Sequence, residues 1–228
     1  MSRASHRRRS GLLVTFEGIE GCGKTTQAKL LAGWLREQGW PVLEVREPGG
    51  TDLGESLRSL LLRPAPEGID PRSELFLYLA ARCQLVARVI APALAAGRIV
   101  LADRFGDASV AYQGGGRALG LSRVRSLVRF ATGAIIPDRT YLLDLSPSTS
   151  LARVRARGRP DRLEGEGLAF HRSVRAAYRR IATDEPERVR MLRGTGSPER
   201  IAGLIRKDLI GLLRSVATSG RGDRGRGT

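Results

Sequence analysis

The sequence has little cysteine and no long apolar run. Its 228 residues include two cysteines, Cys22 and Cys83, which are too few for a disulfide scaffold and indicate a reducing compartment such as the cytoplasm. Arg, Gly or Asp interrupts every hydrophobic stretch before the roughly 20 residues that a bilayer crossing needs, so we expect no membrane association. The hydrophobic fraction of 41% suffices for a sizeable core, which excludes a wholly disordered chain.

Lysine is also scarce, because the 39 basic residues comprise 36 Arg and 3 Lys. An Arg preference this strong is typical of a GC-rich genome, which raises Arg throughout a chain without any anionic partner. The net charge of +16 is scattered through expected helices, and aromatic residues make up only 5% of the sequence. We therefore expect no dedicated nucleic-acid binding.

Short apolar runs alternate with longer segments of helical spacing. The runs predict buried strands at 12–16, 42–45, 99–102, 141–145 and 189–192. Helical spacing covers 25–38, 74–96, 122–132, 170–181 and 198–213. This alternation predicts an α/β fold with a doubly wound, parallel, five-stranded sheet. We expect one domain over residues 11–218, with disordered basic tails at 1–10 and 219–228.

The first expected strand ends in a glycine-rich loop. Residues 18–26 read GIEGCGKTT, which satisfies the P-loop pattern of Gly, four residues, Gly, Lys and Ser or Thr. The glycines let backbone N–H groups close around phosphate oxygens at a helix N-terminus. We expect Lys24 to reach the β- and γ-phosphates and the Thr25 hydroxyl to ligate Mg²⁺. The loop predicts a bound nucleoside triphosphate, but it leaves open whether the triphosphate is hydrolysed or donates to an acceptor.

Further polar segments follow the expected strands at the edge of the sheet where ligands bind in this architecture. They are 46–51, the helical segment 57–61, 103–105 and 111–117. A carboxylate that ends a buried strand beside a P-loop suits Mg²⁺, so Asp103 joins Thr25 as a predicted metal ligand. The adjacent Arg104 can bind a phosphate group through two hydrogen bonds.

Six segments of the sequence together resemble the thymidylate kinase family of nucleoside monophosphate kinases. They are, in order, FEGIEGCGKTTQ, REPGGT, LRSLLL, YLAARCQLV, DR followed by AYQGGGR, and RARGRPDRLE, and they span residues 16–164. The resemblance implies a P-loop nucleoside monophosphate kinase with ATP as donor, Mg²⁺ as cofactor and dTMP as acceptor, which makes dTDP for dTTP supply. It also implies a homodimer. The alternatives are another nucleoside monophosphate or deoxynucleoside kinase, or a nucleotide-dependent switch.

The resemblance implies contacts for the phosphate and sugar of dTMP. Arg58 and Arg104 would hold the phosphate group. Glu20 would accept a hydrogen bond from the sugar 3′-hydroxyl, and Glu47 is a further acceptor contact. Tyr112 would pack where a ribose 2′-hydroxyl would lie, which favours deoxynucleotides.

The resemblance also implies contacts for the base. Arg82 would donate to the thymine edge, and Tyr78 would stack on the base from the same helix face, because positions i and i+4 are neighbours. Relatives usually carry Phe at the position of Tyr78, so the hydroxyl needs a partner here. Ser109 and Gln113 are expected contacts, whereas Ala108 replaces a hydroxyl-bearing residue.

A run of five arginines lies in the segment 151–164, which we expect to act as a lid. They are Arg153, Arg155, Arg157, Arg159 and Arg162. Charge on the transferred phosphoryl group must be stabilised, and residues 19–22 of the P-loop supply no cation. The sequence thus resembles the bacterial variety whose lid contributes the catalytic arginine. We expect Arg157 in that role, Arg153 and Arg162 in support, and Glu164 orienting an arginine.

The predicted catalytic residues are Lys24, Arg104 and Arg157. The predicted donor site consists of Gly18, Gly21, Cys22, Gly23, Lys24, Thr25, Thr26 and Arg153. The acceptor oxygen of dTMP is already anionic near neutral pH, so no general base is required. This agrees with the two histidines, since His6 falls in a tail and His171 is expected on a helix surface.

Overall fold

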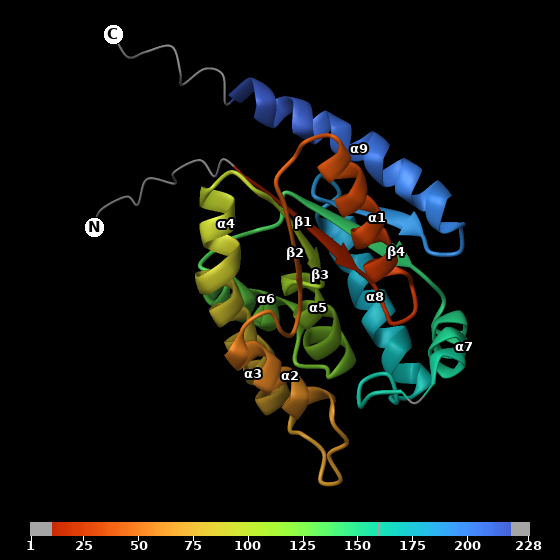
Figure 1. Ribbon diagram of the computed structural model, residues 1–228. Helices are drawn as coiled ribbons and strands as arrows, with labels where there is room; N and C mark the ends of the chain where they lie inside the picture. Colours follow the sequence, from red (N-terminus) through yellow and green to blue (C-terminus); the bar gives the residue numbers. More distant parts are fainter. Residues whose placement is uncertain (1–10, 159, 220–228) are drawn as a thin grey trace.

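Five parallel strands form one sheet in the order β2-β3-β1-β4-β5 (Figure 1). The computed structural model describes residues 11–158 and 160–219. The strands are β1 (Leu12–Glu17), β2 (Val42–Arg46), β3 (Ile99–Asp103), β4 (Arg139–Asp144) and β5 (Val189–Arg193). The predicted α/β class and doubly wound parallel sheet are confirmed. β4 begins two residues earlier than expected, because Arg139 is buried beside β1 with its charge offset by a 2.9 Å ion pair to Asp208.

Helices connect the strands. They are α1 (Lys24–Glu37), α2 (Asp52–Leu62), α3 (Pro71–Leu85), the π-helix η1 (Val86–Ile90), α4 (Ala91–Ala95), α5 (Gly106–Ser109), the π-helix η2 (Val110–Gly116), α6 (Leu121–Ala131), α7 (Pro147–Arg157), α8 (Leu168–Asp184) and α9 (Pro198–Ser219). The expected helix 74–96 begins three residues earlier, because Asp70 caps its N-terminus and Pro71 occupies the first helical position.

The two faces of the sheet bury alternate residues of β1. Phe16 stacks near Tyr141, whose hydroxyl donates to Asp208 on α9 at 2.9 Å. Leu13 faces the other way and packs with Leu85 and Ile90. Helices α1 and α9 contact each other on the first face, and α3, η1 and α4 cover part of the second (Figure 1). The central strand β1 is thus buried on both faces, as a parallel sheet requires.

The segment from 106 to 116 is helical, which the sequence pattern did not predict. Three consecutive glycines end it, and helix propensity disfavours them. Packing explains the helix, since η2 lies against α8. A Cβ atom at Gly115 would lie 2.5 Å from Ala177 Cβ, and one at Gly116 would lie 2.6 Å from the Phe170 ring. Only glycine allows the two helices to approach this closely.

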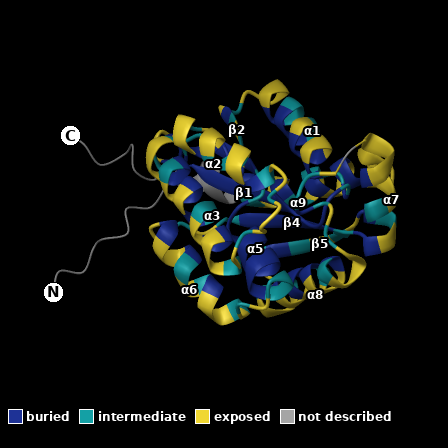
Figure 2. Cartoon of the chain, turned by 90° about the horizontal axis from the view of Figure 1, so that it is seen from below, coloured by how far each residue is buried: buried dark blue, intermediate teal, exposed yellow. Residues whose placement is uncertain are grey.

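The helical run Pro71–Ala95 is long and apolar enough to match a membrane span by length and composition, with a mean hydropathy of 1.4. A core helix of a soluble fold meets the same criterion. Here Leu85, Ile90 and Leu94 of this run pack against the sheet residues Leu13 and Val100. Figure 2 shows buried strands enclosed by helices whose outer faces are exposed. The predicted tails at 1–10 and 219–228 fall almost entirely outside the described residues.

Candidate active site

A cavity of about 870 Å³ lies at the carboxyl edge of the sheet and joins the P-loop to the loops after β2 and β3. The chain order reverses here, because β3 and β4 flank β1 on opposite sides, and ligands bind at such points. The predicted site residues that line it are Glu20, Gly21, Gly23, Lys24, Thr25, Thr26, Glu47, Arg58, Tyr78, Asp103, Arg104, Ser109, Tyr112, Gln113, Arg157 and Glu164. Residues from six separate segments of the chain therefore meet in one space.

The P-loop begins the cavity. Gly23 caps α1 with φ of 101°, a left-handed conformation that glycine adopts without steric cost. The Lys24 side chain folds back onto the loop, and its ammonium group donates to the carbonyl oxygens of Gly18 and Ile19 at 3.1 and 3.0 Å. The N–H groups that open α1, together with its dipole, favour an anion at this point. The loop has the geometry that a polyphosphate requires.

Two oxygen atoms that could hold a cation lie beside the P-loop. The Thr25 hydroxyl donates to Asp103 Oδ2 at 2.5 Å, although 78 residues separate them in the sequence. No cluster of three or more His, Cys, Asp or Glu side chains suited to a metal occurs within residues 11–158 and 160–219. Mg²⁺ usually takes one or two protein oxygens and completes its shell with water and substrate phosphates, so this pair fits such an ion.

Arg104 forms the floor between the P-loop and the loop after β3. It has a φ of 71°, and it joins Glu20 Oε1 at 2.9 Å and the Tyr112 hydroxyl at 3.2 Å. Tyr112 donates to the same Glu20 oxygen at 2.5 Å, and the guanidinium lies 4.9 Å from the centre of its ring. Burial alone would raise the pKa of Glu20, but the charges of Arg104 and Lys24 lower it below its usual value. Glu20 is therefore ionised, and its second oxygen, Oε2, is buried with no hydrogen-bond partner among the described residues.

A second buried carboxyl group, Glu17, supports this floor. It accepts from the Phe105 backbone N–H and from the Tyr178 hydroxyl, each at 2.7 Å. Burial and the negative charge of Asp107 raise the pKa of Glu17 to about 7, although the charge of Arg104 opposes the shift. Glu17 thus ties β1, the loop after β3 and α8 together behind the cavity.

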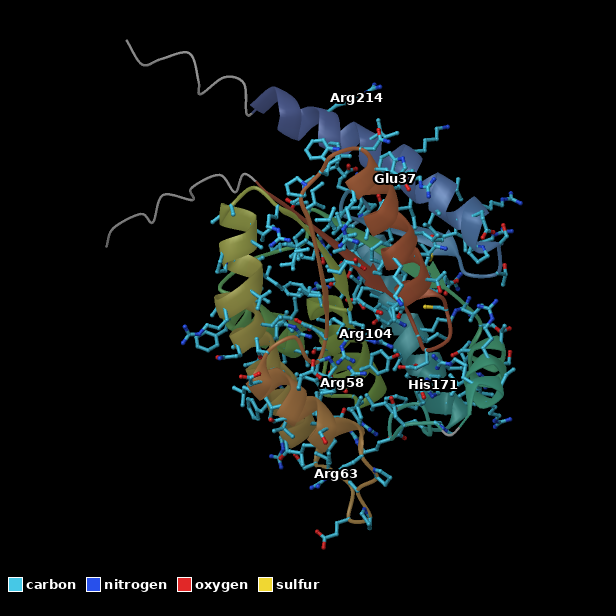
Figure 3. All side chains as sticks on the ribbon, viewed as in Figure 1. Glu37, Arg58, Arg63, Arg104, His171 and Arg214 are labelled. Carbon is cyan, nitrogen blue, oxygen red and sulfur yellow. The ribbon has the colours of Figure 1, made fainter. Side chains whose placement is uncertain are left out.

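The far wall of the cavity carries the predicted acceptor residues. Arg58, on α2, donates to the Pro48 carbonyl oxygen at 2.9 Å, and it lies with Arg104 at this end of the sheet (Figure 3). Tyr78 on α3 and Ser109 on α5 line the same space, as does Gln113, which donates to Glu74 at 2.8 Å. The wall therefore combines a cation, an aromatic ring and neutral hydrogen-bonding groups.

Arg82 does not line the cavity, in contrast to the other predicted acceptor residues. It is 1% exposed, and it donates to Glu47 at 2.7 Å, to Ser109 Oγ at 2.9 Å and to the Phe105 carbonyl oxygen at 3.0 Å. The structure places Arg82 behind the wall, where it holds two residues, Glu47 and Ser109, that do line the cavity.

The predicted lid arginines lie apart from one another. Arg157 is 59% exposed, lines the cavity and joins Glu164 at 2.7 Å, which is the partner expected for a lid arginine. Arg153 bonds instead to the carbonyl oxygens of Gly21 and Gly194 at 3.0 and 3.3 Å. Arg162 reaches across to α3, and Arg159 falls outside the described residues. Arg153 and Arg157 thus have different partners although they share a helix face.

The expectation for His171 was wrong, because this residue is fully buried on α8. It belongs to the buried stripe that continues with Val174, Tyr178 and Ile181, a helical spacing that could have identified it. Its Nδ1 lies 3.6 Å from Glu20 Oε2, and no hydrogen-bond partner is found for either ring nitrogen among the described residues.

Sequence reasoning missed three charged residues around the site. Glu17 ends the first strand in the same FEG segment that opens the P-loop, so a carboxylate at the end of a buried run was the available signal. Glu74, Tyr78 and Arg82 follow one another at intervals of four residues on α3, so they share one helix face. Arg117, which ends the AYQGGGR segment, joins Glu74 at 3.1 Å.

The P-loop, the strand-end carboxylate and the cation-lined pocket at one edge of a doubly wound sheet define a P-loop nucleotide kinase. A family model described as thymidylate kinase matches residues 16–205. The thymidylate kinase of Pseudomonas putida strain GB-1 is 47% identical over 213 residues, which is 93% of this chain and 100% of that protein. That of Synechococcus sp. strain JA-2-3B'a(2-13) is 47% identical over 210 residues, covering 92% and 99%.

A solved structure agrees with these sequences. The crystal structure of thymidylate kinase from Ehrlichia chaffeensis has a TM-score of 0.71 and 31% identity, and the match covers 87% of this chain and 98% of that one. The chain belongs to the thymidylate kinase family. The predicted family, fold and kinase activity are therefore confirmed.

Proposed function

We propose that this enzyme transfers the γ-phosphoryl group of ATP to dTMP and so makes dTDP and ADP. The observation that carries the proposal is the continuity of the cavity of about 870 Å³, which runs from Lys24 and Thr25 in the P-loop to Tyr78, Ser109 and Gln113. In-line transfer needs donor and acceptor phosphates in one space. A switch or a simple hydrolase has no use for the second half of this cavity.

The donor half would hold the triphosphate and its metal. The P-loop N–H groups and Lys24 would bind the β- and γ-phosphates, and Thr25 and Asp103 would hold Mg²⁺, whose chemistry is to neutralise and align the donor phosphates. Arg153, which donates to the carbonyl oxygen of Gly21 in the P-loop, would lie next to the nucleotide. Gly18 and Cys22 would contribute through the backbone of the loop.

The acceptor half would hold dTMP between α2, α3 and the loop after β3. Arg58 and Arg104 would bind its phosphate, because both reach the cavity and a monophosphate already carries negative charge. Glu20, which lines the cavity, would accept a hydrogen bond from the sugar 3′-hydroxyl, and Tyr112 would close the space at the 2′ position. Tyr78 would stack on the base, with Ser109 and Gln113 contacting its edge. Arg82 would act on the base through Ser109 in the described arrangement.

The chemistry would consist of positioning and charge stabilisation. The acceptor oxygen of the monophosphate is already anionic, so no side chain needs to remove a proton from it. Lys24, Arg104 and Arg157 would stabilise the charge on the transferred phosphoryl group. Arg157 comes from the lid, and its carboxylate partner Glu164 would aim it. The lid would also keep water away from the γ-phosphate.

A coupled ADP-release assay with dTMP, dUMP, dCMP, dGMP and thymidine tests this assignment. We expect dTMP to give the highest kcat/KM, and the four other compounds to be poorer by at least about tenfold. A preference for thymidine would replace the proposal with a deoxynucleoside kinase. ADP release at the same rate without any acceptor would replace it with a nucleotide-dependent switch.

The enzyme is further proposed to act as a homodimer in the cytoplasm. Phe76 and Phe130 are 59% and 87% exposed on α3 and α6, two helices that contact each other, and such rings are favourable in a subunit interface. Sedimentation of the wild type and of Phe130→Ser measures the oligomeric state. We expect a dimer that the substitution weakens, and a monomer for both proteins would contradict the proposal. Neither nucleic acid nor membrane is part of the proposal.

A further inference from the structure

The buried carboxylate of Glu74 joins three parts of the chain. It lies in the first turn of α3 and is 0% exposed. Its Oε1 accepts from Gln113 at 2.8 Å and from Arg117 Nε at 3.3 Å. Its Oε2 accepts from Arg117 Nη2 at 3.1 Å and from Arg162 Nη1 at 2.7 Å. Burial alone would raise the pKa of Glu74, but the hydrogen bonds from Arg117 and Gln113 lower it, so the group is a carboxylate.

Arg162 brings the lid to this point. Its Nε also donates to the Leu61 carbonyl oxygen at the end of α2, at 2.8 Å. Two segments of the acceptor wall therefore bind one lid side chain. Four residues further along, Glu166 pairs with Arg117 at 2.6 Å, so the same cluster holds the chain on both sides of Glu164.

The four charged groups of this cluster are balanced so that the lid can separate from α3 at a reduced electrostatic cost. Glu74 and Arg117 form a neutral pair on the body of the enzyme, and Arg162 and Glu166 bring one charge of each sign from the lid side. If Arg162 and Glu166 withdraw, Glu74 keeps Arg117 and Gln113 and is not left as an isolated buried charge. The cost that usually follows the loss of a buried partner is thereby reduced.

We propose that Glu74 is a positioning residue for the lid. It fixes the seat of the lid, which consists of the contacts of Arg162 with Glu74 and Leu61, against the acceptor wall. Arg157 and Glu164 then reach the cavity only when Arg162 is bound to Glu74. The proposal rests on the phosphoryl-transfer function proposed above. Because Gln113 shares the same carboxylate and also lines the acceptor half, the seat of the lid and the shape of that half are set together.

Kinetics of Glu74→Gln test the proposal. The substitution keeps the shape of the side chain but removes its charge. We expect kcat to fall about 10²-fold, as for a misplaced catalytic group, while KM for ATP changes less than about threefold. ADP release without acceptor should rise relative to release with dTMP. Asp208→Asn is the control, because Asp208 also binds two arginines, Arg139 and Arg190, but lies on α9 away from the lid. It should lower the melting temperature and leave kcat unchanged.

A readout independent of activity separates this proposal from the proposed function. Trypsin cleavage after Arg157, followed by mass spectrometry in the folded protein, should be faster in Glu74→Gln than in the wild type and unchanged in Asp208→Asn. If the wild type fails to phosphorylate dTMP, the proposed function falls, but the cleavage rates still report on the seat of the lid. Equal cleavage of Glu74→Gln and the wild type overturns the positioning role.

A double-mutant cycle excludes a purely structural effect. If Glu74 acts through Arg162, adding Arg162→Met to Glu74→Gln should lower kcat by less than threefold beyond the single change. Fully multiplicative losses in kcat would mean that the two residues act separately, and the proposal would be rejected. Melting temperatures of all four proteins establish that each is folded at the assay temperature.

Discussion

A rise in pH from about 5 to 8 is expected to weaken the fold through one buried carboxyl group, Glu17. This side chain is 0% exposed at the end of β1, where it accepts from Phe105 and Tyr178. Burial and the charge of Asp107 raise its pKa from the usual 4.5 to about 7. The folded state therefore binds this proton more tightly than the unfolded state does.

The sign and size follow from proton linkage. The stability that this group contributes is fully present below pH 4.5, and it is lost as the pH rises through about 7 in the folded protein. The change between the two pKa values corresponds to roughly 3 kcal/mol of unfolding free energy, most of which falls between pH 5 and 8. Carboxylates whose pKa is lowered, such as Glu20, act in the opposite direction, but their contribution is complete above pH 4.5.

Urea unfolding at pH 5 and pH 8 measures this for the wild type and for Glu17→Gln, which carries no charge at either pH. The contributions of the other carboxylates are common to both proteins and cancel in the difference. We expect the unfolding free energy of the wild type to fall by roughly 2 to 3 kcal/mol more than that of the variant. Parallel pH dependences in the two proteins would refute the reasoning, because Glu17 would then be ionised throughout.

Four further substitutions test the site and the fold. Lys24→Ala should lower kcat by about 10²-fold or more in the ADP-release assay, because the substitution removes a positive charge that stabilises the phosphates. A fall in kcat of tenfold or less would contradict the catalytic role of Lys24. Arg157→Ala should lower kcat roughly 10³-fold while the Kd of dTMP changes less than threefold, and comparable activity would remove the lid arginine from the mechanism. Arg82→Ala should reduce the ratio of kcat/KM for dTMP to kcat/KM for dCMP, and unchanged selectivity would argue against a role at the base. The same substitution leaves the buried carboxylate of Glu47 unpaired and should lower the unfolding free energy by about 3 kcal/mol. Gly115→Ala should lower the unfolding free energy by about 1 to 3 kcal/mol, since its Cβ would lie 2.5 Å from α8, whereas Gly203→Ala has open space around it and should not.

The sequence predicted those parts of the fold that depend on local pattern. All five strands were expected within two residues, since buried parallel strands read as apolar runs, and the P-loop was found because its glycines and Lys24 are contiguous. The segment 106–116 was missed because its helix depends on packing against α8 and not on propensity. His171 was misplaced because its stripe of buried neighbours was not followed.

The candidate site was predictable as a set of residues but not as a set of contacts. Arg58, Arg104 and Gln113, which the motif segments named, all line the cavity, because strand ends converge on one edge. They gave no sign that Arg82 is held behind the wall or that Arg162 reaches α3. Both orientations are set by carboxylates that are distant in the sequence. Glu47 lies 35 residues from Arg82, and Glu74 lies 88 residues from Arg162. Local sequence patterns do not reveal pairs that are this far apart.

The single hollow that runs from the P-loop to the acceptor wall also determines which small molecules should inhibit the enzyme most strongly. A two-headed compound that carries an adenosine group and a thymidine group on one oligophosphate chain would meet both halves at once. Once one end is bound, the other is presented at a high local concentration, so the tethered compound should exceed the affinity of either nucleotide alone by about 10²-fold or more. A chain that is too short to span the hollow would lose this advantage entirely.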